Sequence, residues 1–482
     1  MRLKSAIVAL AALVAAGCST IAAARRAQRA AEPAASGEAS SRARVILAGR
    51  SLPGLVDFAL TNRPAVAYAQ LAVEDARLAL KALAADAPLA SSTPWTALAA
   101  SVSGGYSGVE ESSQRLHDAV RTHRGNLSAG LSVDLLIWDF GRYGAKAAAQ
   151  RERVLAAELE LGNVGYTVFE EVADAYFTLL ENDALLDVAR TNEVEFALHL
   201  EHAKRRVEAG EAQELDVLKA RLDLARAREE TLAASNAVIT SSAGLACALG
   251  LEASHAARED VLPRAADPLG FVRQGFAATS VSAAEAFAAA RTNAPSTRIA
   301  RARLRAASNA VDAAVADLMP EVSVSATLSW TDPMWALRWG ASAVQSLFQG
   351  FRRTTAVDRA RVALEQAETE VAAAEQKLSR DLALAMAERD NAREAQLRAE
   401  DSLRQAKENL DVVKSRYELG DASRVDFATA LSAFADAMGG CVGAFYAGQR
   451  AEAAVFRLTG EYPVYDEREV NARAKSQEGE GK

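Results

Sequence analysis

The chain has 482 residues, of which 50% are hydrophobic, 6% aromatic and 24% charged, and its formal net charge is −8 at pH 7. This acidic balance argues against a nucleic-acid partner, because nucleic-acid binding needs basic residues clustered on one surface. The length would suggest about three domains, but an internal repeat favours two fused halves that share one architecture.

The N-terminus predicts a secretory signal over residues 1–17 and an acylated cysteine after it. The apolar run Ala6–Val14 follows two basic residues and is too short to span a bilayer. Cys18 follows "AAG", as in a bacterial lipoprotein signal, so we expect a covalent lipid on Cys18, with ordinary signal cleavage nearby as the alternative. An aspartate directly after the cysteine would resemble an inner-membrane retention signal. Ser19 stands there instead, which favours the outer membrane as the destination. Residues 18–50, rich in Ala, Ser, Glu and Arg, predict an acylated tether.

The first half, residues 51–262, opens with a helix signature and then changes period. "TNRPAVAYAQLAVEDARLALKAL" places Thr61 or Asn62 where either can cap a helix that has Pro64 in its first turn. In "NLSAGLSVDLL" apolar and polar residues then alternate, which predicts a strand of about ten residues. A weaker strand in "WTALAASVSGGY" precedes it, so a β-hairpin is expected at about 95–138.

Long helices follow this hairpin. Residues from about 143 to 208 contain no proline and few glycines, which predicts a helix of roughly 95 Å. A shorter helix returns over about 215–249, and Gly210 suits the left-handed backbone that ends many helices. A charged helix of this length stands in water and survives only by packing on neighbours.

The second half, residues 263–462, has the same order of elements. Its helix signature is "TNAPSTRIARARLRAASNAVDAAV", in which Thr292 or Asn293 can cap the helix. Its β-hairpin is expected at about 321–348, and its helical hairpin turns near Gly420. "RRVEAGEAQELDVLKA" and "SRYELGDASRVDFATA" align without a gap, starting at Arg205 and Ser415, 210 residues apart. The chain therefore predicts two tandem structural repeats and a mainly α fold with a small β part. Residues 463–482 predict a polar tail.

The strand length and alternation match transmembrane strands, with half-buried strands of a soluble sheet as the alternative. Four strands cannot close a barrel in lipid, where every backbone polar group needs a partner. Closure needs a dimer with eight strands or a trimer with twelve. Because eight strands leave an interior that side chains nearly fill, a conduit favours three chains.

The paired tip phrases, the corners "IWDFGRYGA" and "LFQGFRRTT" and the duplicated order of elements resemble the TolC-type outer membrane efflux protein family. The resemblance covers about residues 51–462. It implies a homotrimer whose 12-stranded β-barrel continues into a 12-helix periplasmic α-barrel. With the acylated start, it is similar to the lipoprotein branch that works with a periplasmic adaptor and an RND-type inner-membrane pump.

Four residues in the repeated phrase are candidates besides Gly210 and Gly420. Asp216 and Asp426 stand at the starts of the returning helices, where a carboxylate favours helix formation. In the resembled family, carboxylates near the second tip narrow the tunnel, and Asp426 matches that position, although a capping role alone is the alternative. Arg206 and Arg416 are candidates to pair with an acid on a neighbouring helix or to contact the adaptor. The alternative is that both are solvated arginines near a helix C-terminus.

Other polar residues give weaker evidence of a functional site. His199 and His202 are spaced to share a metal, but a solvated helix face is favoured because no further ligand is near in sequence. Cys247 and Cys441 are expected to be buried and unpaired. We see no catalytic constellation and expect neither an enzyme nor a cofactor beyond the lipid on Cys18.

The leading function is therefore a passive exit duct of an efflux system. A duct for type I protein secretion, or a coiled-coil spacer that does not conduct, are the alternatives. The sequence does not identify the transported substrate.

Overall fold

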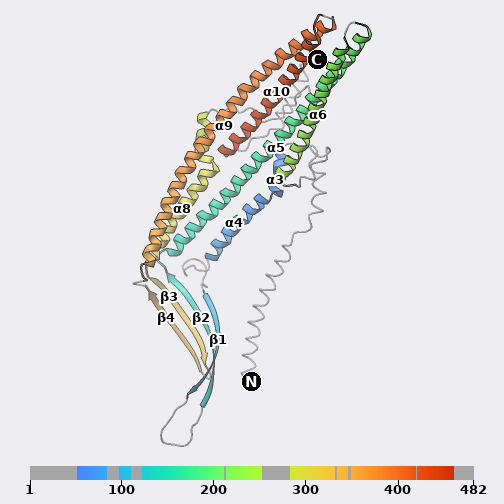
Figure 1. Ribbon diagram of the computed structural model, residues 1–482. Helices are drawn as coiled ribbons and strands as arrows, with labels where there is room; N and C mark the ends of the chain where they lie inside the picture. Colours follow the sequence, from blue (N-terminus) through green and yellow to red (C-terminus); the bar gives the residue numbers. More distant parts are fainter. Residues whose placement is uncertain are drawn as a thin grey trace, which may run out of the picture. The chain divides into compact units, whose positions relative to one another are not determined.

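The computed structural model describes residues 52–83, 97–109, 122–210, 213–251, 283–331, 334–345, 349–419 and 421–460 (Figure 1). All of them belong to one compact unit. The predicted signal and tether, Cys18, Gly420 and the polar tail lie outside the described residues. Within them, helices dominate and one small antiparallel sheet is present, which confirms a mainly α fold with a small β part.

Each half begins with two helices where the sequence predicted one. Helices α3 (Leu52–Asn62) and α4 (Pro64–Leu83) open the first half, and α7 (Ala283–Asn293) and α8 (Pro295–Ala316) open the second. A proline starts the second helix of each pair, because its fixed φ suits the first helical position and its missing N–H is not needed there.

The predicted caps at these breaks are wrong. The Thr61 hydroxyl and the Asn62 amide both donate to the carbonyl of Phe58, so they close α3 and do not cap α4. Thr292 likewise donates to the carbonyl of Ala289, and the N-cap of α8 is Ala294. These polar residues donate to the last carbonyls of the preceding helix. The sequence predicted one helix in each half, so the end of a helix at this point was not foreseen.

The sheet has four strands in the order β1-β2-β3-β4, all antiparallel (Figure 1). They are β1 (Ala97–Val109), β2 (Thr122–Trp138), β3 (Glu321–Thr331) and β4 (Met334–Val344). The central pairing, β2 with β3, joins the two halves, and it is in register from Ser128 opposite Thr331 to Leu136 opposite Ser323 before one irregularity.

The long helices have equal lengths in the two halves. Helices α5 (Arg142–Glu208) and α9 (Arg352–Glu418) each have 67 residues, or about 100 Å at 1.5 Å per residue. The return helices are α6 (Glu214–Ala248) and α10 (Arg424–Thr459). α5 packs against α6 and also against α10, and α10 packs against α9, so the lateral order is α6, α5, α10, α9.

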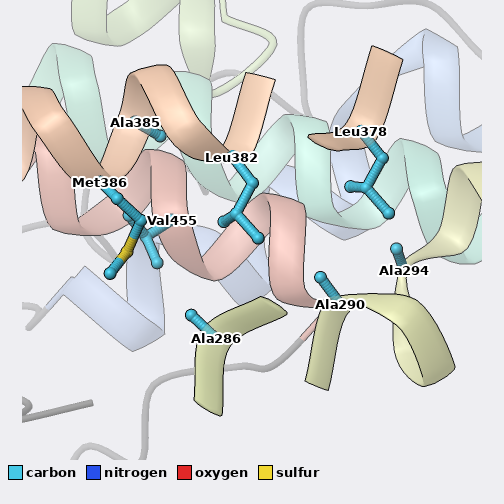
Figure 2. Packing of buried hydrophobic residues seen from close by; sticks show 8 residues of the cluster. All are labelled: Ala286, Ala290, Ala294, Leu378, Leu382, Ala385, Met386 and Val455. Atoms are coloured by element: carbon cyan, nitrogen blue, oxygen red, sulfur yellow. The ribbon is translucent and has the colours of Figure 1, made fainter. Parts of the chain in front are cut away.

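Small residues bring the helices of the second half together. Figure 2 shows alanines of α7 facing larger side chains of α9, with Val455 of α10 beside them. The cluster consists of Ala286, Ala290, Ala294, Leu378, Leu382, Ala385, Met386 and Val455. Alanine lets the backbone of α7 approach closely, and the leucines and the methionine fill the remaining space.

Two glycines end the return helices at equivalent places. Gly250 and Gly460 have φ of 79° and 71°, in the left-handed region that favours glycine. A Cβ on Gly250 would lie 3.3 Å from the carbonyl oxygen of Asn62, and one on Gly460 would lie 2.8 Å from that of Asn293. Each return helix therefore ends directly against the break before a proline helix.

Neither of the two described cysteines is in a disulfide, and only one matches its predicted burial. Cys441 is buried, whereas Cys247 is exposed near the end of α6. The expectation that Cys247 is buried is wrong, because among the described elements α6 packs mainly against α5.

Candidate functional site

The candidate site lies at the helical tips, where both halves contribute to one cluster of side chains. Its apolar base joins α5, α6 and α10 through Phe196, Leu224, Ala227, Phe427 and Leu431, with side chains of α9 packed against them. Each tip follows a helix of 67 residues, so the two tips lie at the same distance along the long helix of their half. Only the fold brings the two tips together.

Both return helices start with a capping box. In α10, the Asp426 carboxylate accepts hydrogen bonds from the Ser423 backbone N–H at 3.1 Å and from the Ser423 hydroxyl at 2.7 Å. The Ser423 hydroxyl in turn accepts from the Asp426 N–H at 3.2 Å. These bonds, the hydroxyl first and the backbone second, lower the pKa of Asp426 below its ordinary value. In α6, Gln213 and Asp216 form the equivalent box.

Arg424 connects the start of α10 to α6. Its Nη1 donates to Asp223 Oδ2 at 2.7 Å, and its Nε lies 3.9 Å from Asp216 Oδ1. The Arg424 side chain is 13% exposed and that of Asp223 is 21% exposed, so water screens the pair only partly. Asp223 was missed at the sequence level, although it lies two helical turns after Asp216 on the same face of α6.

An aromatic group lies beside this ion pair. Tyr417 and Phe427 stack with ring centroids 5.2 Å apart, and the His199 ring lies 5.4 Å from Tyr417 and 5.2 Å from Phe427. The guanidinium carbon of Arg206 is 5.7 Å from the Tyr417 ring centroid, within cation–π range. Arg206, predicted as a tip residue, thus contacts the other half of the chain.

The prediction of a solvated His199 is wrong. Its side chain is only 2% exposed, and neither ring nitrogen has a hydrogen-bond partner within the described residues. Burial, followed by the nearby charge of Arg424, lowers the pKa of His199 to about 4. The imidazole is therefore neutral at neutral pH. His202, three residues on, is exposed, because it faces away from the cluster.

The remaining predicted residues are placed as follows. Gly210, which follows the C-cap Ala209 of α5, has φ of 78°. Arg416 is exposed and makes no ion pair within the described residues. Asp426 is exposed at the tip, whereas Asp216 is half-buried and near Arg424, so the two equivalent aspartates differ in their surroundings. In the described part of the chain, no group of three or more His, Cys, Asp or Glu side chains is placed to hold a metal.

The family comparison matches both halves of the chain. A model of the family described as outer membrane efflux protein matches residues 55–251 and 287–461. The comparison with curated proteins gave no match.

Solved structures share the fold at low identity. CusC has a TM-score of 0.70 and 19% identity over 85% of this chain and 92% of its own. The outer membrane protein VceC of Vibrio cholerae has a TM-score of 0.67 and 18% identity over 85% and 96%. The outer membrane channel CmeC of Campylobacter jejuni has a TM-score of 0.70 and 15% identity over 88% and 89%. The resemblance stated from sequence is confirmed.

Proposed function

Because the chain belongs to the outer membrane efflux protein family, we propose that it is the passive exit duct of a tripartite efflux system. Membership assigns it to the outer membrane and to efflux. In the proposal, three copies form the duct, a periplasmic adaptor contacts the helical tips, and an RND-type inner-membrane pump supplies the energy. A lipid on Cys18 anchors each copy to the outer membrane.

The main support for this proposal is that the two outer edges of the described sheet have no partner strand. Among the described strands, β1 pairs only with β2 and β4 pairs only with β3. In a membrane, the outer edges of β1 and β4 would leave N–H and C=O groups without partners, at a cost of several kcal/mol each. Pairing β4 of one copy with β1 of the next satisfies these groups. Three copies then give a closed barrel of twelve strands.

The outer helices support the same assembly. α6 and α9 stand at the two ends of the lateral order, and α6 carries exposed apolar residues on heptad-like spacing. These are Leu215, Leu218, Leu222, Leu232 and Ile239, with exposures of 52–63%. α6 and α10 are also apolar and long enough to cross a membrane by composition alone, yet only 22% and 33% of their most apolar windows are buried. A neighbouring copy would cover such surfaces, as in a coiled coil.

Asp426 is the proposed periplasmic constriction. Threefold symmetry brings three copies of this exposed carboxylate toward one axis. Its capping bonds hold it ionised well into acid solution, since they lower its pKa. A ring of such charges concentrates cations at the inner mouth of the duct.

Conductance and assembly test the proposal together. The detergent-solubilised protein should appear as three chains in native mass spectrometry and should conduct ions in planar bilayers. Cells that lack it should accumulate a small-molecule dye while protein secretion continues. A stable monomer would refute the closure argument, trimers without conductance would leave a spacer, and loss of protein secretion alone would favour type I secretion. Replacement of Cys18 by serine should abolish acyl-chain labelling.

A further inference from the structure

Two charged residues share the polar face of the sheet. Asp134 of β2 lies opposite Ser325 of β3, and Arg338 of β4 lies opposite Thr327. Directly opposed residues in antiparallel strands have their side chains on the same face, and so do residues two apart in one strand. Asp134 and Arg338 therefore lie on one face, and both are exposed.

Most side chains around these two charges are small. The neighbouring positions on the same face are Ser132, Leu136, Ser323, Ser329, Ala336, Gly340 and Ser342, of which Leu136 is the larger apolar neighbour of Asp134. The hydroxyls of Ser323 and Ser342 lie 3.0 Å apart, as expected for side chains that share a face. Each of these neighbours is much shorter than the side chain of Arg338.

Within the described strands, Glu321 and Arg124 are two further charged positions in the same alternation, and both lie away from the pair along the strands. Glu321, at the helical end of β3, is bound by Arg142 at 3.0 Å, so its charge is compensated. Arg124 lies ten residues from Asp134 along β2, opposite Ser107. At about 3.4 Å per residue, this separation is roughly 34 Å, well beyond a Debye length.

The opposite face of the sheet is apolar. Trp335, Leu337 and Trp339 of β4 are 69%, 69% and 79% exposed, and they alternate with Ala336 and Arg338. A strand that faces lipid on one side and water on the other has this alternation. The apolar face is thus the lipid face of the proposed barrel, and the face with Asp134 and Arg338 lines the lumen.

We propose that Asp134 and Arg338 form a charge belt that selects zwitterionic or dipolar solutes inside the barrel of the duct. This inference rests on the proposed trimer. Repeating the order β1-β2-β3-β4 three times places Asp134 and Arg338 alternately on every second strand around the barrel. Because Ser325 and Thr327 are two residues apart, the two sets of charges are offset by about 7 Å along the strands.

The wall charges of the belt act electrostatically on solutes in the lumen. Twelve strands spaced about 4.8 Å apart and tilted about 40° enclose a radius of about 12 Å. The Debye length at physiological ionic strength is about 8 Å, so the wall charges act across most of this lumen. Opposite charges in equal number offset one another for a simple ion. A solute that carries both signs can approach an aspartate and an arginine together.

Reversal potentials in a potassium chloride gradient test the belt in planar bilayers. Asp134→Asn should raise the ratio of chloride to potassium permeability by about twofold, and Arg338→Gln should lower it by a similar factor. The double variant should return to the unmodified ratio. In liposome swelling, both single variants should slow entry of glycine betaine relative to arabinose.

Conservative variants serve as controls. Asp134→Glu and Arg338→Lys keep the charges and should keep the ratio, and Ser325→Thr adds only a methyl group between them. An unchanged ratio in both neutralised variants would overturn the belt, as would shifts in the same direction. Absence of conductance from the unmodified protein is a different result, which would overturn the proposed duct and the belt together.

Discussion

The Nη1 of Arg424 lies 2.7 Å from Oδ2 of Asp223, although 201 residues separate them in the chain. This contact ties the tip of the second helical hairpin to the return helix of the first. It is partly shielded from water, since the two side chains are 13% and 21% exposed. The relative position of the two tips therefore depends on charged contacts, this ion pair among them, in addition to apolar packing.

Arg424→Gln should loosen the two tips without unfolding the chain. The substitution leaves Asp223 without its cation, at a cost of about 2 kcal/mol for a partly shielded pair. Hydrogen exchange in the assembled protein should become faster at the starts of α6 and α10. Arg416→Gln is the matched control, because Arg416 is exposed and makes no ion pair within the described residues. Equal exchange in the two variants would exclude a special role for Arg424.

Asp426→Asn should reduce cation selectivity, with little change in trimer content, because three charges leave the proposed constriction. Asp216→Asn should change selectivity much less, since Asp216 is half-buried beside Arg424. Single-channel recordings measure both. If the two variants behave alike, both aspartates serve only as helix caps. The capping contribution of Asp426 is present above its unfolded pKa and disappears as the pH falls through its lower folded pKa.

His199 should make the protein less stable in mild acid. Its folded pKa is about 4, below the ordinary value of 6.5, so the unfolded chain takes up a proton that the folded chain refuses. Stability is therefore lost as the pH falls from about 6.5 toward 4, and the loss from this group at pH 5 is about 2 kcal/mol.

Thermal unfolding followed by circular dichroism at pH 7 and pH 5 measures this loss. His199→Phe should remove much of the difference between the two values, because a neutral ring of similar shape replaces the imidazole. His202→Gln is the control at an exposed position and should retain the difference. The same pH dependence in His199→Phe would assign the effect to other groups.

Gly460→Ala should destabilise the second half by about 2 kcal/mol or more. The new Cβ would meet the Asn293 carbonyl oxygen at 2.8 Å and force a left-handed backbone on alanine. Gly440→Ala, inside α10 with open space around the added Cβ, should be neutral or stabilising by up to about 1 kcal/mol. Denaturant unfolding of both variants compares them. A Gly460 variant as stable as the Gly440 variant would contradict the close approach of the two backbones.

The sequence by itself determined the elements and their order. Absence of proline predicted the long helices, and alternating apolar and polar residues predicted the strands, because both signals depend on neighbours a few residues apart. The repeated phrase located both tips. The same local reasoning failed at Thr61, since whether a polar residue caps the next helix or closes the previous one depends on a backbone break that propensity does not fix.

The tertiary structure decided which side chains meet. Nothing near His199 in sequence shows that Tyr417 and Phe427 cover it, and nothing near Arg424 points to Asp223 as its partner. The register of β2 against β3 and of β3 against β4 likewise places Asp134 and Arg338 on one face of the sheet, offset by two residues along the strands. Such contacts join positions from different halves of the chain. Their energies depend on burial and distance, which exist only once the two halves have packed.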